Sequence, residues 1–286
     1  MTLMSTDNES ARTFSVRHVT RDDTRVGDDT VVVEEPMEIR IVFGPESERS
    51  TNSLSITMRT PGHDFELAAG FLFTERVLSS PDQIREIAFC GPPAPSRRAS
   101  NIVRVDLDPS VDFDLERLRR NFFASSSCGI CGKASLEAVE VRDLPPLEPG
   151  RPRVRGAMIH DLPDLLRSSQ PLFDRTGGLH AAGLVDPDGK LDDVREDVGR
   201  HNAVDKLLGR AFLDGRTPLF DRLMVISGRA SFEILQKALA AGVPVIVAIG
   251  PPSSLAVDLA ERFGMTLVGF ASPERFNIYC GSQRMI

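Results

Sequence analysis

Three short apolar runs near the end of the chain constrain its fold more than any other feature. They cover residues 222–227, 243–249 and 266–270, and each has the length and β-branched content of a buried strand. The stretches between them, over about 231–241 and 253–263, have helical spacing, and each is followed by a glycine that can end a helix. Strands that alternate with helices in this way form βαβ units. We therefore expect an α/β fold with a parallel sheet in the C-terminal half.

The carboxyl ends of these strands predict where a ligand binds, because ligands on parallel sheets lie beyond that edge. The three ends are Ser227-Gly228-Arg229, Gly250-Pro251-Pro252-Ser253 and Phe270-Ala271-Ser272. The first of them is a strand-to-helix turn that resembles a simple cradle for phosphate or carboxylate. A single Ser-Gly-Arg sequence is weak evidence for a phosphate site. It therefore indicates where a ligand could bind but does not identify the ligand.

Composition divides the rest of the chain into a tail and a smaller domain. Residues 1–30 are polar, mixed in charge and without periodicity, which predicts a flexible tail. A proline-rich stretch at 144–150 is typical of a linker or surface loop. We therefore expect an N-terminal domain over 31–150 and an α/β domain over 151–286.

The expected N-terminal domain mixes strands and a helix. Residues 38–43, 54–58 and 101–107 alternate between polar and apolar side chains, as half-buried strands do. Leu67, Phe71 and Leu72 share one face of a helix expected over about 66–75. These elements predict a smaller mixed α+β part.

Charge and composition exclude several classes of partner. The chain of 286 residues has a formal net charge of −7, no Trp and one Tyr, which argues against binding to a nucleic-acid polymer or an anionic membrane. It contains no apolar run long enough to span a membrane and no apolar targeting segment. We therefore expect a cytoplasmic protein, whose four Cys stay reduced and do not form a disulfide scaffold.

The most distinctive chemical motif is Cys128-Gly129-Ile130-Cys131, set among small residues. Lys133 and a helix expected just after Cys131 would favour the thiolate form of the cysteines. A thiolate is the form that attacks sulfur or binds a metal. The plain alternative is two small buried side chains in a loop, but a glycine-flanked CxxC in a reducing compartment is seldom inert.

Several kinds of chemistry remain open for this CxxC. A structural zinc site needs four ligands, whereas Cys90 and Cys280 are isolated in sequence. A zinc deaminase needs a His with Glu two residues later, and none of the five His has one, so no tightly bound zinc is expected. A thioredoxin-like dithiol at the end of a strand is another option. A sulfur carrier with a persulfide on Cys128 is the last.

Two further clusters are candidates for ligand contacts. Paired glycines precede His180, which could act as a donor or base, or could equally be a core histidine at a turn into a strand. Asp197, Arg200, His201 and Asn202 crowd the first turn of a helix with one apolar face. Helix N-termini bind anions and Arg offers a planar fork for phosphate. The alternatives are a solvated charged helix end and a simple His201–Asp205 pair.

Taken together and in order, these motifs resemble the formate dehydrogenase accessory sulfurtransferase family, called FdhD. The resemblance covers nearly the whole chain after the tail, and the ordered set is highly specific although any one motif could arise by chance. Its motifs are Met58–Gly62, Glu66–Leu72, the CGICG loop, TGGLHAAGL, EDVGRHNAVDKLLG, SGRASFEILQKA, Ser254–Val257 and Leu267–Phe270.

The resemblance implies a function in sulfur transfer. Members of this family accept sulfur from a cysteine desulfurase as a persulfide and pass it to the molybdenum cofactor, a bis(molybdopterin guanine dinucleotide) that is bound as substrate. The sulfurated cofactor then activates formate dehydrogenase. The persulfide carrier of the family matches Cys128, and Cys131 matches the second Cys, which assists or exchanges. Members are homodimers with a cytidine deaminase-like fold, here without the zinc ligands.

The resemblance also implies where the guanine-nucleotide cofactor binds. We assign the cofactor site to the stretch that matches the family's binding segment, together with two residues from other strand ends. The assigned residues are Phe270, Ala271, Ser272, Pro273, Glu274, Arg275, Arg229 and His180. Relatives often carry a basic residue and Gly where Ser272 and Pro273 stand, which leaves Arg275 and the backbone amides to contact phosphate. The alternatives are a cofactor-binding chaperone without covalent sulfur transfer and a thioredoxin-like dithiol oxidoreductase.

Overall fold

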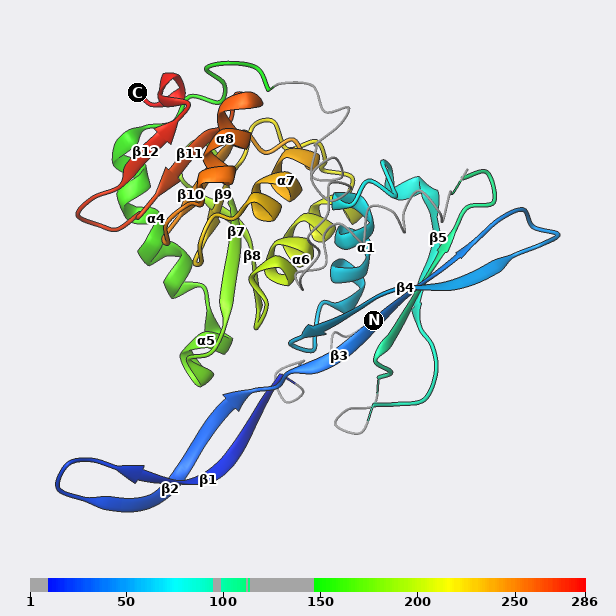
Figure 1. Cartoon of the computed structure of the whole chain (residues 1–286), viewed down its shortest axis with the longest axis horizontal. Coiled ribbons are helices and arrows are strands. Elements are labelled where there is room, and N and C mark those ends of the chain that lie inside the picture. The colour runs from blue at the N-terminus through cyan, green and yellow to red at the C-terminus, as the bar shows by residue number, and fades with distance from the viewer. Residues whose placement is uncertain (1–9, 95–98, 112, 114–146) are drawn as a thin grey trace.

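The structure is a computed structural model that describes residues 10–94, 99–111, 113 and 147–286 (Figure 1). Its strands form a six-stranded sheet, a four-stranded sheet and a separate two-stranded hairpin. The chain is therefore a mixed α/β protein, as expected from its sequence. The cytidine deaminase-like detail of that expectation stays a prediction.

The six-stranded sheet forms the centre of the C-terminal half. Its strand order is β12-β11-β10-β9-β7-β8. β10 pairs in parallel with both β9 and β11, so the predicted parallel arrangement is confirmed for these three strands. β7, β8 and β12 are antiparallel to their neighbours. The strands are β7 (His180–Val185), β8 (Leu191–Asp197), β9 (Leu223–Ile226), β10 (Val245–Ala248), β11 (Thr266–Gly269) and β12 (Asn277–Cys280).

Helices cover both faces of this sheet (Figure 1). Successive side chains of a strand point to opposite faces, and Val225 accordingly packs with α4 (Gly156–Ser168), whereas Met224 packs with the helices of the other face. That other face is covered by α6 (Arg200–Leu213), α7 (Phe232–Ala240) and α8 (Ser254–Arg262). Burial on both sides explains why these strands are continuous apolar runs without alternation.

Local signals define the ends of the helices between the parallel strands. Ser253 caps α8, because its hydroxyl accepts a hydrogen bond from the backbone N–H of Ala256 at 3.3 Å. Gly242 after α7 and Gly264 after α8 have φ angles of 77° and 69°, a left-handed conformation that glycine adopts without strain. The predicted helix ends are therefore confirmed.

The N-terminal part contains the four-stranded sheet and one long helix. In the order β4-β3-β6-β5, β3 is antiparallel to β4 but parallel to β6. This arrangement confirms that the part mixes strands and a helix. The elements are β3 (Glu35–Phe43), β4 (Ser50–Arg59), α1 (Asp64–Thr74), the short 3₁₀ helix η2 (Pro81–Gln83), β5 (Ile84–Phe89) and β6 (Ile102–Leu107).

The two parts share one continuous core, because α1 packs against α6 across the expected boundary near residue 150. A Cβ on Gly70 of α1 would lie 1.9 Å from the carbonyl oxygen of Asp205, and a Cβ on Gly209 of α6 would lie 1.9 Å from that of Glu66. The two helix backbones therefore approach as closely as they do only because both crossing positions lack side chains. The sheets are separate, but their apolar side chains are buried together.

The N-terminal hairpin differs from the flexible tail expected over residues 1–30. β1 (Ala11–Val19) and β2 (Thr24–Val32) pair along their full length, from Ala11 with Val32 to Val19 with Thr24. The hairpin extends away from the two larger sheets (Figure 1). Its Val and Thr residues favour strands, but exposure on both faces removes the apolar alternation by which a strand is recognised in sequence.

Two smaller elements complete the described chain. The short helix α5 (Pro171–Thr176) precedes β7, and Gly177 ends it with a φ of 67°. A final 3₁₀ helix, η3 (Ser282–Arg284), follows β12. Arg284 is fully buried there, where its guanidinium donates to the carbonyl oxygens of Glu148 and Gly264 at 2.7 Å each. These bonds tie the C-terminus to the stretch that precedes α4.

Candidate functional site

The carboxyl ends of the three parallel strands lie together, as predicted. The backbone N–H of Gly250 donates to the carbonyl oxygen of Gly228 at 3.1 Å, and the N–H of Phe270 donates to that of Gly250 at 3.2 Å. A Cβ on Gly250 would lie 2.9 Å from the oxygen of Gly228, so only glycine permits this approach. The three loops therefore form one connected surface at this edge.

His180 joins the same surface from an antiparallel strand. Because β7 runs antiparallel to β9, the first residue of β7 lies at the carboxyl end of β9. The N–H of Ala181 donates to the hydroxyl of Ser227 at 2.9 Å, and a Cβ on Gly228 would lie 3.3 Å from Nδ1 of His180. Burial lowers the pKa of His180, and the charge of Arg200 lowers it further against the opposing effect of Asp197. The imidazole is therefore neutral at neutral pH.

Arg229 occupies the turn between β9 and α7. Its side chain is exposed, and it forms no ion pair with any residue that the structure describes. An exposed guanidinium on a turn at the sheet edge is free to contact an anion. The structure thus brings His180 beside Gly228, the residue next to Arg229 in the chain.

The predicted cofactor loop at 270–275 is held by its own backbone. Ala271 is buried and its N–H donates to Ala248, whereas the N–H of Ser272 donates to the carbonyl of Arg275 at 2.9 Å. The N–H of Arg275 in turn donates to the hydroxyl of Ser272 at 3.1 Å. These amides are therefore already engaged. The parts of the loop that a ligand can reach are the exposed residues Phe270, Pro273, Glu274 and Arg275.

Phe270 stands out in this loop because of its backbone. Its φ of 54° is left-handed, an uncommon conformation for a residue with a large side chain, and its ring is 40% exposed. His160 of α4 lies behind the loop, with Nδ1 3.3 Å from the carbonyl oxygen of Ser272 and its ring 4.9 Å from that of Phe276. The loop is thus fixed from two sides while its apolar ring faces outward.

The structure adds the first turn of α6 to this edge. Arg200 is the first residue of α6 and its charge lowers the pKa of both His180 and His201. For His201 burial is the larger cause, and together the two effects bring the pKa to about 4. His201 Nε2 lies 3.4 Å from the hydroxyl of Ser231 and 3.9 Å from a carboxylate oxygen of Glu233. Sequence alone singled out Arg200 and His201 but did not place them beside His180.

Buried polar groups hold this turn of α6 in place. Asp197 accepts hydrogen bonds from the N–H of Gly199 at 2.8 Å and from the side-chain amide of Asn202 at 3.0 Å. Its second oxygen accepts from the N–H of Thr60 at 3.1 Å. Asn202 also donates to the carbonyl of Met58 at 2.7 Å. Two motifs that are far apart in sequence, around 58–62 and 196–202, therefore form one network.

The two candidate sulfur-carrying cysteines, Cys128 and Cys131, lie outside the described residues. Cys90 and Cys280 are both half-buried free thiols. Burial raises the pKa of Cys280, which favours an unreactive thiol and agrees with a packing role. Within the described ranges, no group of three or more His, Cys, Asp or Glu side chains is arranged to hold a metal ion.

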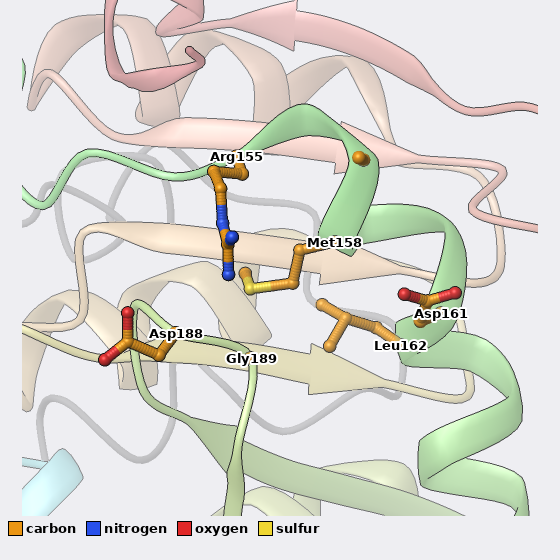
Figure 2. Close-up of a pocket in the computed structure, with 7 residues that line it drawn as sticks. Arg155, Met158, Asp161, Leu162, Asp188 and Gly189 are labelled. Carbon is orange, nitrogen blue, oxygen red and sulfur yellow. The ribbon is translucent and has the colours of Figure 1, made fainter.

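A shallow cavity of about 280 Å³ lies at the other end of β7, far from His180. Figure 2 shows Arg155 and Met158, from the start of α4, reaching toward the turn that carries Asp188 and Gly189. None of the predicted site residues lines it. The cavity is therefore separate from the surface at the carboxyl ends of the strands.

No helix in the described part of the chain is both long enough and apolar enough to cross a membrane.

Comparisons with known proteins agree with the order of the motifs. The model of the FdhD/NarQ family matches residues 32–286. The sulfur carrier protein FdhD of Streptomyces coelicolor is 50% identical over 264 residues, which cover 90% of this chain and 89% of that protein. The sulfur carrier protein FdhD of Mycobacterium tuberculosis is 44% identical over 276 residues, which cover 94% and 96%.

A solved structure resembles the whole fold. The crystal structure of a candidate formate dehydrogenase accessory protein from Desulfotalea psychrophila matches with a TM-score of 0.70 at 25% sequence identity. The match covers 97% of this chain and 100% of that one. The arrangement of the sheets and of the edge that carries His180 therefore belongs to a fold that has been seen by crystallography.

Proposed function

The chain belongs to the FdhD/NarQ family, and from this premise we propose that it is a sulfur carrier that holds sulfur as a persulfide on Cys128. The observation that carries the proposal is the glycine-flanked CxxC, which stands in a chain that is 50% and 45% identical over 90% and 94% of its length to two relatives named as sulfur carriers. A persulfide carrier needs a thiolate within reach of other molecules. Small flanking residues and Lys133 provide that setting in the sequence.

The loading step is a thiol–persulfide exchange. The Cys128 thiolate attacks the outer sulfur of a persulfide on a cysteine desulfurase. A new S–S bond forms on Cys128, the S–S bond of the donor breaks, and the donor cysteine leaves as a thiolate. No net oxidation or reduction occurs in this step. Cys131, three positions away, is placed in sequence to assist release or exchange.

The acceptor in this proposal is a molybdenum cofactor that carries guanine dinucleotides and serves formate dehydrogenase. A guanine dinucleotide is large and anionic, so it requires cationic side chains and an apolar contact for its ring. Arg229, Arg275, His180 and the exposed ring of Phe270 supply these groups at the edge of the sheet. The net charge of −7 does not oppose such binding, because the charge of a pocket is local.

Mass spectrometry of the loaded protein tests the carrier role directly. After incubation with a cysteine desulfurase and cysteine, we expect the peptide that contains Cys128 to gain the mass of one sulfur atom. The gain should be absent in Cys128→Ala and retained in the matched control Cys280→Ala, whose thiol is half-buried. Cys131→Ala should still load, but should support formate dehydrogenase activation less well than the wild type.

The same experiment separates the carrier from a cofactor-binding chaperone. A chaperone without covalent sulfur transfer would bind guanine nucleotide tightly and show no mass gain on Cys128. Retention of the full gain in Cys128→Ala would overturn the assignment of that residue. Formation of a Cys128–Cys131 disulfide with a dithiol substrate, but of no persulfide, would favour a thioredoxin-like reductase instead.

The assembly and the compartment are part of the proposal. We propose a homodimer in the cytoplasm, by analogy with the family. Sedimentation of the full chain measures the oligomeric state, and a monomer at micromolar concentration would contradict it.

A further inference from the structure

Arg200 is a cation that forms no ion pair in the described part of the molecule. It forms no ion pair or hydrogen bond with any described residue, and its Nε is shielded from solvent and lacks an acceptor there. A buried donor that is left unsatisfied destabilises the protein, and more strongly when the group is charged. Such a group in a native protein calls for an explanation, and a bound ion or ligand is one.

The groups around Arg200 are two imidazoles and a carboxylate, and none of them forms an ion pair or hydrogen bond with it. His180 and His201 are uncharged at neutral pH, because burial and then the charge of Arg200 lower the pKa of both. Glu233 is the nearby carboxylate, and the charge of Arg200 helps to lower its pKa. It forms no ion pair with Arg200: it accepts hydrogen bonds from its own backbone N–H and from Ser231, and it lies 3.9 Å from His201 Nε2. Asp197, which lies below the turn, is paired with Lys206 at 2.7 Å.

The backbone at the same place also lacks an acceptor. Gly199 is the N-cap of α6 and offers no side-chain cap, and the first turn contains no acidic residue. The first helical hydrogen bond is donated by Ala203 to Gly199, so no described residue accepts from the N–H groups of Arg200 and His201. The positive end of the helix dipole adds to the field at this point.

Gly228 keeps the space in front of this turn open. A Cβ at residue 228 would lie 3.3 Å from Nδ1 of His180 and 3.8 Å from Cβ of Arg200. A side chain there would fill the gap between the imidazole and the first turn of α6. Because residue 228 has no side chain, room remains between the imidazole of His180, the guanidinium of Arg200 and the backbone N–H groups of the first turn of α6.

We propose that Arg200 and the first turn of α6 bind a diphosphate group, with His180 and His201 as hydrogen-bonding partners. This inference rests on the proposed function, in which the ligand is a guanine dinucleotide, and it assigns the diphosphate to residues outside the 270–275 loop. The loop then contacts the rest of the nucleotide through Phe270 and Arg275. The engaged amides of that loop are consistent with this division.

Calorimetry with three probes tests the proposal on the full chain at about 0.15 M salt, where exposed charges are screened beyond about 8 Å. The probes are GDP, guanosine and inorganic pyrophosphate. We expect Arg200→Gln to weaken GDP and pyrophosphate binding at least tenfold and to change guanosine binding by less than twofold. Arg210→Gln is the matched control, because it removes an exposed Arg from the same helix, and it should leave all three affinities unchanged.

Stability distinguishes a ligand-binding residue from a structural one. Because the guanidinium has no described partner, Arg200→Gln should melt at the same temperature as the wild type or higher, whereas a structural residue would lower the melting temperature. Should Arg200→Gln fail to fold, Arg200→Lys provides the second variant: it keeps the charge, loses the planar fork, and should bind pyrophosphate more weakly than the wild type.

Three results would overturn the proposal. The first is that Arg200→Gln binds GDP as tightly as the wild type does. The second is that this variant loses as much affinity for guanosine as for GDP. The third is that the wild-type protein binds neither GDP nor pyrophosphate. The persulfide assay on Cys128 does not involve Arg200. If the wild type forms the persulfide and Arg200→Gln binds GDP and pyrophosphate as well as the wild type does, this site alone is rejected. If Arg200→Gln loses pyrophosphate binding but the wild type never forms a persulfide, the carrier function is rejected and the site is kept.

Discussion

Lys206 and Asp197 form an ion pair from which solvent is excluded, with Nζ 2.7 Å from Oδ2 and side chains that are 1% and 0% exposed. Lys206 also donates to the carbonyl oxygen of Thr60 at 2.8 Å. The pair joins the end of β8 to α6, and the bond to Thr60 fastens the residue after β4 to the same helix, less than two turns from Arg200. It links the stability of the two parts of the chain to the geometry of the proposed anion site.

We expect Lys206→Met to lower the free energy of unfolding by about 3–5 kcal/mol, the usual cost of leaving one member of a buried pair without its partner. Urea denaturation measures the change. Arg210→Gln is the control, since the exposed pair of Arg210 with Asp214 should contribute less than about 1 kcal/mol. A loss below about 1 kcal/mol for Lys206→Met would mean that the buried carboxylate is neutral or finds another partner.

The crossing of α1 and α6 should tolerate no side chain. We expect Gly70→Ala to destabilise the protein by about 3 kcal/mol, the upper end for overpacking, because the new Cβ would overlap the backbone of α6. Gly156→Ala provides the comparison: a Cβ there meets no atom within 4 Å, and the change should stay within about 0.5 kcal/mol. Chemical denaturation of both variants gives the two values, and similar losses would refute the close approach.

Glu66 should make stability depend on pH in the acid range. Burial alone would raise the pKa of its carboxyl, but hydrogen bonds and charge from His63 and Arg195 prevail and lower the pKa to about 2. A lowered folded-state pKa stabilises the protein above the unfolded value of 4.5 and loses that effect as the pH falls toward 2. The contribution is about 3 kcal/mol, since one pKa unit corresponds to about 1.4 kcal/mol.

Urea titrations of the wild type and of Glu66→Gln between pH 6 and pH 2 measure this effect. The stability difference between the two proteins should be constant above pH 5 and should shrink below pH 4.5. A difference that does not change over this range would show that the carboxyl of Glu66 titrates normally in the fold.

His201 should produce a second pH dependence at higher pH. Its folded-state pKa of about 4 lies below the ordinary value of 6.5, so the unfolded chain binds the proton more readily between these values. Stability is therefore complete above pH 6.5 and falls as the pH is lowered toward 4. His201→Asn removes the titrating group, and its unfolding midpoint should drop less than that of the wild type between pH 7 and pH 5. Parallel curves would contradict the lowered pKa.

The secondary structure of the C-terminal half was predictable because its signals are local. Each buried strand is an apolar run, and each helix between strands ends at a glycine that adopts a left-handed conformation. The hairpin over residues 11–32 was missed for the opposite reason: its strands are exposed on both faces and have no apolar periodicity. The antiparallel direction of β7, which brings His180 to the site, has no local signal.

By itself the sequence determined the alternation of strands and helices, the edge at which the strand-end motifs meet, and the family, because these depend on apolar spacing and on ordered motifs. Only the tertiary structure decided that Arg200 stands unpaired beside His180 and His201, and that the amides of Phe270, Ala271, Ser272 and Arg275 are already engaged. The physical reason is that a charge acquires its partners through space. Whether an arginine is solvated, paired or left for a ligand depends on the elements that pack around it, and those are distant in the chain.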